Sequence, residues 1–111
     1  NFAEVHDCFT IAEIIDIEDL GFYPKGKAAH AVRDGATRLN GEIPTNPSGG
    51  LKSKGHPIGA TGIGQVVEVF DQFTGKAGER TVPNAEIALT HNFGATGASA
   101  AIHIFKKVDR K

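Results

Sequence analysis

Three short segments of this sequence carry residue types that acid–base and nucleophilic chemistry uses. They are HDCF with His6 and Cys8, GHP with His56, and HNFG with His91 and Asn92. An imidazole beside a thiol can move protons near neutral pH, because a neighbouring histidine lowers the pKa of the thiol. The segments lie far apart along the chain, so this chemistry requires a fold that brings them together.

The stretch Lys52–Gly64, KSKGHPIGATGIG, places His56 between a glycine and a proline. We expect Pro57 in the first turn of a helix, where its missing N–H costs nothing. Residues near the 3.6-residue period predict the apolar face of that helix, and Gly75 predicts its end: Ile63, Val66, Val67, Phe70 and Phe73. His56 would stand at the N-terminus of a buried helix, where free N–H groups favour negative charge. That position suits a developing oxyanion, although a histidine near a helix start is also common without a function.

The N-terminal half predicts a strand, a helix and an irregular connection. Phe2–Cys8 is a strand of alternating character, and Thr10–Glu13 is a capping box with Phe9 and Ile14 as its hydrophobic staple. Gly21 ends the helix, and four apolar residues form its buried stripe: Ile11, Ile14, Ile15 and Leu20. We expect one short helix within residues 22–42, a brief strand at Ile43–Asn46 and a loop at Pro47–Gly55.

The C-terminal part predicts a hairpin. Glu86–Thr90 and Gly97–Phe105 are strands, joined by the connection HNFGAT. The element order predicts an α/β fold in which helices cover a mixed, mostly parallel sheet with an antiparallel edge. Ligands of such sheets gather beyond the carboxyl ends of the strands. We expect five residues at or just past such ends: His6, Cys8, His56, His91 and Asn92.

Composition limits the function classes. A chain of 111 residues has room for one small domain, and a net charge of −1 does not indicate binding to nucleic acid or to an anionic membrane. Apolar runs are too short to span a bilayer. One cysteine favours a reducing compartment. The missing initiator Met and the apolar start suggest that further sequence precedes residue 1.

Three blocks together resemble the C-terminal part of a thiolase, over residues 4–106. They are HDCF from His6, NPSGGLKSKGHPIGATG from Asn46 and HNFG from His91. HDCF in place of the NEAF of ordinary thiolases resembles the sterol-carrier-protein-type (SCP2/SCP-x) thiolases. The resemblance implies half of a thiolase fold and a coenzyme A-dependent acyltransferase. Such an enzyme cleaves 3-ketoacyl-CoA with CoA to acetyl-CoA and a shortened acyl-CoA, or runs the reverse condensation.

The resemblance also implies roles for individual residues. His56 would polarise a thioester oxygen and help activate the nucleophile, and His6 would complete that oxyanion hole through a water. Asn92 stands where ordinary thiolases carry the cysteine of a CxG motif, so Cys8 is the substitute acid/base. Gly94 would present its backbone N–H to a second oxyanion. The implied catalytic residues are Cys8, His56, His6 and Gly94, and the implied substrate-binding residues are Asn92, His91 and Gly55.

Each of these residues also has an interpretation without catalysis. Cys8 is also typical of a small buried apolar residue, and His6 of a strand end where it satisfies a backbone group. His91 shapes the pocket or only supports the hairpin. We expect structural or solvated positions for His30 and His103 and a turn-forming role for Asp7. Lys52 and Lys54 attract CoA phosphates or belong to a solvated loop.

The resemblance implies that this chain is incomplete. The nucleophilic cysteine of a thiolase lies in its N-terminal half, and here Cys8 is the sole cysteine. We therefore predict that residues 1–111 are a C-terminal thiolase domain lacking its first strand and helix. That strand would run through the middle of the sheet, so its absence would leave unpaired edges. The rest of the thiolase, on the same or a separate chain, should pack against this segment.

Further expectations concern ligands, assembly and location. The resemblance implies acyl-CoA and CoA as substrates, no bound cofactor and a homo-oligomer. A cytoplasmic enzyme is favoured, with a peroxisomal one as the alternative. Two rival functions stay open. One is a non-catalytic module for CoA or lipid binding or for assembly. The other is a metal site, for which the spacing matches no short ligand motif: His6, Cys8, His56 and His91.

Overall fold

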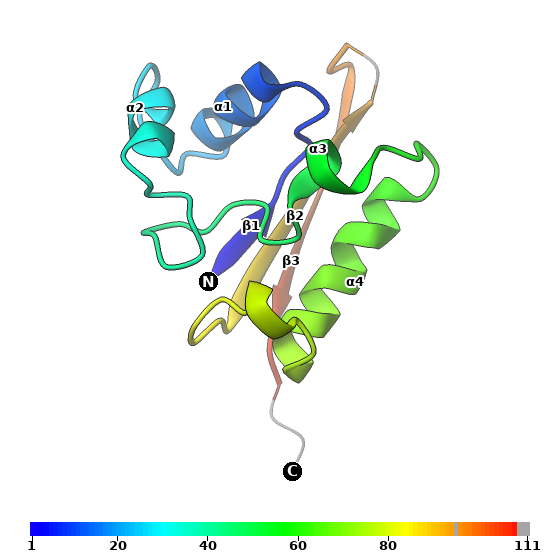
Figure 1. Ribbon diagram of the computed structural model, residues 1–111. Helices are drawn as coiled ribbons and strands as arrows, with labels where there is room; N and C mark the ends of the chain where they lie inside the picture. The colour runs from blue at the N-terminus through cyan, green and yellow to red at the C-terminus, as the bar shows by residue number, and fades with distance from the viewer. Residues whose placement is uncertain (95, 109–111) are drawn as a thin grey trace.

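The computed structural model describes residues 1–94 and 96–108, and it contains a mixed sheet with the order β1-β2-β3 (Figure 1). β1 (Phe2–Glu4) pairs in parallel with β2 (Ile87–Gly94), and β2 pairs antiparallel with β3 (Ser99–Lys106). An isolated parallel bridge joins Ala3 to Thr45. Thr45 lies in the segment Ile43–Asn46, which we expected to be a strand. The predicted α/β class and C-terminal hairpin are confirmed.

Helices cover both faces of the sheet. α1 (Thr10–Asp19) and α2 (Ala28–Arg33) lie on one side, and α4 (Thr61–Thr74) lies on the other (Figure 1). Two apolar clusters fill the spaces between these layers. One contains Phe2, Val69, Val82, Ala85 and Ala88, and the other contains Ala3, Val5, Ile17, Tyr23 and Ala28. Successive residues of a strand point to opposite faces, so β1 is buried on both faces. Its predicted alternating character was therefore wrong.

β1 and β2 pair directly, and the absence of the first strand and helix of the thiolase half stays a prediction. Phe2 of β1 is directly opposite Ala88 of β2, and the register continues to Glu4 opposite Thr90. No space remains for another strand between them, because hydrogen-bonded strands lie about 4.8 Å apart. Ala95, in the expected hairpin connection, and residues 109–111 lie outside the described residues.

α1 begins differently from the prediction. Phe9 precedes the helix without a side-chain capping bond, so the Thr10–Glu13 capping box was wrong. The Glu13 carboxylate instead accepts a hydrogen bond from Asn46 Nδ2 at 3.0 Å. Helix period alone does not show which part of an apolar stripe is covered. Ile14 and Leu20 pack against the core, whereas Phe9, Ile11 and Ile15 are exposed. Gly21 ends the helix region with a positive φ of 77°, as expected.

α4 begins at Thr61 rather than at Pro57. The Pro57 carbonyl accepts hydrogen bonds from the N–H groups of Ala60 and Thr61, which form a turn ahead of the helix. A short helix, α3 (Gly50–Lys54), occupies part of the expected loop. Gly75 ends α4 in the left-handed conformation, as predicted.

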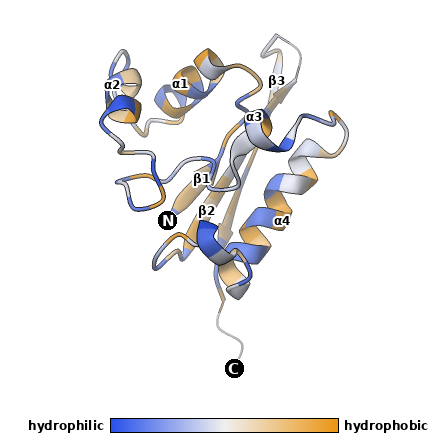
Figure 2. Cartoon of the chain, viewed as in Figure 1, coloured by the Kyte–Doolittle hydropathy of each residue, from blue (hydrophilic) through white to orange (hydrophobic). Residues whose placement is uncertain are grey.

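The faces of α4 were assigned the wrong way round. Its predicted apolar stripe is largely exposed at four positions: Ile63, Val66, Val67 and Phe70. Gln65, Glu68 and Gln72 are buried instead, alongside Val69. Figure 2 shows hydrophilic and hydrophobic residues alternating along this helix. Among the described residues no helix is long and apolar enough to cross a membrane.

Candidate active site

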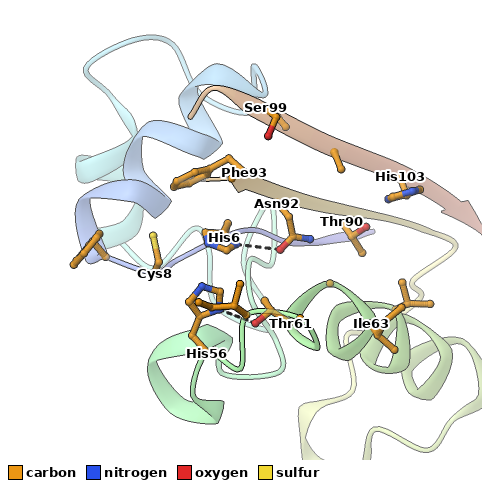
Figure 3. A pocket seen from close by; sticks show the side chains of 18 residues that line it. His6, Cys8, His56, Thr61, Ile63, Thr90, Asn92, Phe93, Ser99 and His103 are labelled. Carbon is orange, nitrogen blue, oxygen red and sulfur yellow. Dashed lines mark hydrogen bonds between the residues drawn. The ribbon is translucent and has the colours of Figure 1, made fainter. Parts of the chain in front are cut away.

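A pocket of about 970 Å³ opens at the end of the sheet where β1 stops and the β2–β3 hairpin begins (Figure 3). Three separate parts of the chain contribute to its walls: the segment after β1, the residues before and within the start of α4, and the hairpin. The lining side chains with reactive or polar groups include His6, Cys8, His56, Thr61, Asn92, Ser99 and His103. The predicted meeting of the thiol and two imidazoles at one edge of the sheet is therefore confirmed.

His6 lies at the centre of the pocket wall and is almost fully buried. Its Nδ1 is 3.0 Å from Asn92 Oδ1 (Figure 3). The ring contacts two aromatic neighbours, with its centroid 4.8 Å from that of His56, edge to face, and 4.6 Å from that of Phe93. These contacts hold the His6 ring in one orientation.

His56 is exposed to the pocket and is held by the start of α4. Its Nδ1 is 2.7 Å from Thr61 Oγ1, and Thr61 is the first residue of that helix. The Thr61 hydroxyl lies 3.3 Å from the Pro57 carbonyl, to which it donates. His56 is thus connected to the helix start through a side chain instead of lying in the first turn.

Asp7 joins the HDCF segment to the segment that carries His56. Its buried carboxylate accepts hydrogen bonds from the backbone N–H of Leu51 at 2.7 Å and of Lys52 at 3.5 Å, at the beginning of α3. A Cβ on Gly50 would overlap the Asp7 carboxylate, so glycine is required for this close approach. Asp7 therefore caps α3 and sets the distance between the two histidine-bearing segments.

Glu4 makes a second connection between the same segments. Its carboxylate accepts hydrogen bonds from the Ser48 N–H at 2.9 Å and the Ser48 hydroxyl at 2.7 Å, and Lys54 Nζ lies 3.7 Å away. Burial raises the pKa of Glu4, while the Ser48 hydrogen bonds and the Lys54 charge oppose that shift. Asn46 adds a third connection, since its Oδ1 accepts from the Val5 N–H at 2.8 Å.

Comparisons with known proteins identify the family of this chain. The sequence profile of a family described as "Thiolase C-terminal domain-like" matches residues 1–107. The chain belongs to this family. It is 57% identical over 107 residues to an acetyl-CoA acetyltransferase of Methanothermobacter thermautotrophicus, covering 96% of this chain and 28% of that protein. It is 48% identical over 103 residues to sterol carrier protein 2 of Oryctolagus cuniculus, covering 93% and 19%.

A solved structure supports the fold. The chain superposes on an Ltp2-ChsH2(DUF35) aldolase with a TM-score of 0.76 and 22% sequence identity, covering 98% of this chain and 27% of the other. The likeness to SCP2-type thiolases, expected from HDCF, GHP and HNFG, is confirmed. This thiolase C-terminal domain spans less than a third of the length of the two relatives described above.

Not every predicted site residue of this thiolase domain reaches the pocket. His91 is in β2 and faces α1, where its Nδ1 is 3.5 Å from Asp16 Oδ2 in a buried pair. Gly55 is exposed and lines a different, smaller pocket. Gly94 does line the main pocket, and a Cβ there would lie 2.8 Å from Ser99 Oγ. The expectation that His91 and Asn92 follow the strand was wrong, because β2 continues to Gly94.

Of the remaining histidines and lysines considered in the sequence, only His103 lines the main pocket. His30 is exposed on α2, and His103 lines the pocket from β3. Lys54 pairs with Glu4, and Lys52 Nζ lies 5.8 Å from the centroid of the Phe9 ring. Within residues 1–94 and 96–108, no group of three or more His, Cys, Asp or Glu side chains is placed to hold a metal ion.

Three residues that support the site were not anticipated from the sequence. Thr61 holds His56, and Phe93 packs against His6. Gln65 accepts a hydrogen bond from Asn92 Nδ2 at 2.6 Å. Thr61 and Phe93 belong to the recognised blocks GHPIGATG and HNFG, so their presence there was the available signal. No short motif marks Gln65, which became visible only through its contacts.

Proposed function

We propose that this chain is the C-terminal catalytic segment of an SCP2-type thiolase. The completed enzyme cleaves 3-ketoacyl-CoA with CoA to acetyl-CoA and a shortened acyl-CoA, or condenses acyl-CoAs in the reverse direction. One observation carries the proposal: His6, Cys8 and His56 line the same pocket, although they come from distant parts of the chain. Their residue types match the needs of Claisen chemistry, which are an acid/base and donors for oxyanions.

The thiol of Cys8 is the acid/base in this proposal. A nucleophilic cysteine from the remaining thiolase sequence takes the acyl group as the bond between Cα and the keto carbon breaks. The electron pair stays with the acetyl-CoA carbanion, which receives the Cys8 proton. The Cys8 thiolate then removes the proton of the incoming CoA thiol. The CoA sulfur attacks the acyl-enzyme and releases the nucleophilic cysteine.

The two histidines and Gly94 stabilise negative charge. His56 polarises the thioester oxygen and helps to activate the nucleophile, and its attachment to Thr61 fixes which part of the ring faces the pocket. His6 completes this oxyanion hole through a water. The backbone N–H of Gly94 serves the second oxyanion, and Asn92 orients His6 at 3.0 Å. Preorganised donors of this kind supply much of the rate enhancement in acyl transfer.

The rest of the thiolase sequence completes the fold and the site. The relatives are longer thiolase-family chains. The exposed apolar face of α4 and the exposed Ile102 and Ile104 of β3 are surfaces that such a segment would cover. CoA and acyl-CoA are substrates in this proposal, with no resident cofactor. A homo-oligomer in the cytoplasm, or alternatively in peroxisomes, belongs to the same proposal.

Reconstitution tests the catalytic assignment. This chain is combined with the N-terminal half of a thiolase, and thiolysis is assayed for wild type, Cys8→Ala and His56→Ala. We expect each variant to lose at least about 100-fold in kcat, because each removes an acid/base or oxyanion group. His30→Ala is the matched control, since His30 is exposed on α2 and does not line the pocket. Full activity in Cys8→Ala and His56→Ala would contradict the assignments.

A non-catalytic module for CoA or lipid binding or for assembly is the second candidate. It is favoured by the apolar side chains that line the pocket, among them Phe9, Ile58 and Ile63. A relative is described as non-specific lipid-transfer protein-like 2, from Caenorhabditis elegans. This alternative predicts that the completed protein binds acyl-CoA but shows no thiolysis. Calorimetric binding together with the activity assay separates the two functions.

A further inference from the structure

A row of hydrogen bonds runs from the interior of α4 to the His6 ring. Gln65 Nε2 is 3.2 Å from the backbone oxygen of His91. Gln65 Oε1 is 2.6 Å from Asn92 Nδ2. Asn92 Oδ1 is in turn 3.0 Å from His6 Nδ1 (Figure 3). Gln65 is fully buried, so water does not compete for its amide.

The His91 carbonyl determines the direction of every bond in this row. A backbone carbonyl can only accept, so the Gln65 group that faces it must be the NH₂. Gln65 then presents its oxygen to Asn92, and that oxygen can be satisfied only by the Asn92 NH₂. Asn92 consequently presents its oxygen to His6, which must donate from Nδ1.

We propose that Gln65 is a positioning residue that holds neutral His6 in the Nδ1–H tautomer. In this tautomer the lone pair is on Nε2. The row of amides therefore makes the remaining ring nitrogen of His6 a hydrogen-bond acceptor. Gln65 acts through Asn92 and does not line the pocket itself.

The catalytic consequence rests on the proposed thiolase function. A neutral His6 with a bare Nε2 cannot donate directly to an oxyanion. It can accept one proton of a water molecule, whose second proton then points to the thioester oxygen. The tautomer thereby explains why His6 would act through a water. A His6 ring with its proton on Nε2 would not need the water.

Nitrogen NMR tests the tautomer directly. The complete thiolase, formed from this chain and the N-terminal half, carries ¹⁵N-histidine in this chain alone, and a His6→Phe spectrum identifies the His6 signals. We expect a protonated Nδ1 and an unprotonated Nε2 at a pH where the ring is neutral. A dominant Nε2–H form in the wild-type protein would overturn the proposal.

Variants at position 65 separate positioning from general support of the fold. In Gln65→Leu, Asn92 loses its fixed partner, and the tautomer ratio should move about tenfold toward Nε2–H, the value of one buried hydrogen bond. In Gln65→Glu, both carboxylate oxygens can only accept, so the Asn92 NH₂ still faces residue 65. His6 should therefore keep the wild-type tautomer in Gln65→Glu.

Gln72 provides the matched control. It lies on the same helix, is also buried, and its Nε2 also donates to a backbone carbonyl, that of Arg80, at 2.8 Å. It has no hydrogen bond to Asn92 or His6 among the described residues. Gln72→Leu should leave the tautomer unchanged, and an equal shift in Gln65→Leu and Gln72→Leu would refute a specific role of Gln65.

Kinetics provide a second measurement. Gln65→Leu should lower kcat about tenfold with little change in KM, since a small displacement of a catalytic group affects the transition state most. The two levels of the argument can fail separately. An inactive complete protein with Nδ1–H at His6 contradicts only the proposed thiolase function. An active protein with Nε2–H contradicts only the role of Gln65.

Discussion

The two faces of α4 differ in a way opposite to most helices of globular proteins. The inner face, against the sheet, buries Gln65, Glu68 and Gln72. The outer face exposes Val67, with 52% of its surface accessible, and Phe70, with 55%. A helix normally buries its apolar stripe and exposes its polar residues.

The difference shows that polar side chains of α4 are buried where hydrogen-bond partners are available to them. Each of these three buried polar side chains has a hydrogen-bond partner. Gln65 accepts from Asn92 of the hairpin, and Glu68 accepts from Arg80 at 2.9 Å. Gln72 accepts from the Val82 N–H at 2.9 Å. The outer face has no comparable cover from the described residues. We expect the apolar side chains of this face to be covered by another segment of a thiolase.

Two phenylalanines of α4 give the largest expected contrast. Phe73 packs edge to face on Phe2 with ring centroids 6.1 Å apart, whereas Phe70 is exposed. Phe73→Ala should lower the free energy of unfolding by about 3 kcal/mol, and Phe70→Ala by less than about 0.5 kcal/mol. Urea denaturation measures both. Equal losses would show that the outer face is already packed in the isolated chain.

The order of the two effects should reverse when binding of the N-terminal half is measured instead of stability. If the outer face is the covered surface, Phe70→Ala weakens binding of that half by about tenfold or more, as removal of an aromatic anchor does. Titration of the labelled half measures the dissociation constant. Unchanged affinity of Phe70→Ala would remove the outer face from the proposed interface.

Removing a partner from the inner face should have the next largest effect. Gln72→Leu leaves the Val82 N–H and the Arg80 carbonyl without their partner in a largely buried site. We expect a loss of about 2 kcal/mol in the free energy of unfolding, because unsatisfied buried groups are costly. Urea denaturation measures the loss. The control is Thr74→Ala at the exposed end of the same helix, which should change stability by less than about 0.5 kcal/mol.

A smaller effect is expected from the ion pair of the inner face. Glu68→Gln keeps the shape of the side chain but removes its charge from Arg80. The free energy of unfolding should fall by about 1 kcal/mol, since the Arg80 side chain is 45% exposed and water screens the pair. Raising the salt concentration should reduce the difference between wild type and variant. A difference that grows with salt would argue against an electrostatic origin.

The smallest effect concerns the pH dependence of stability. Burial raises the pKa of Glu4 in the folded state above the ordinary value of 4.5, and the nearby charge of Glu68 adds to the shift. The protonated Glu4 is thus favoured by folding, so its contribution is full below about pH 4.5 and is lost as the pH rises through the folded pKa. Wild type should therefore lose stability relative to Glu4→Gln as the pH rises above about 4.5. Urea titrations at several pH values measure this difference, and an increase with pH would contradict it.

Features that depend on neighbouring residues could be predicted from the sequence. Gly21 and Gly75 end their helices because glycine adopts a positive φ without strain, and that property does not depend on distant contacts. The β2–β3 hairpin follows from two apolar strands with a glycine-containing turn between them. HDCF, GHP and HNFG carry enough residue-type information to identify the thiolase family and to place His6, Cys8 and His56 in one pocket.

Contacts between residues that are distant in the sequence could not be predicted in this way. The apolar period of α4 indicated one continuous face but not what covers it, so Val66 and Phe70 were assigned to the interior. His91 adjoins Asn92 in sequence, yet the alternation of β2 turns it to the opposite side of the sheet, toward Asp16. Gln65 reaches His6 through Asn92 across sequence separations of 27 and 86 residues. Hydrogen bonds of that span exist only after the sheet, the hairpin and α4 have packed together, which is why tertiary structure alone assigns them.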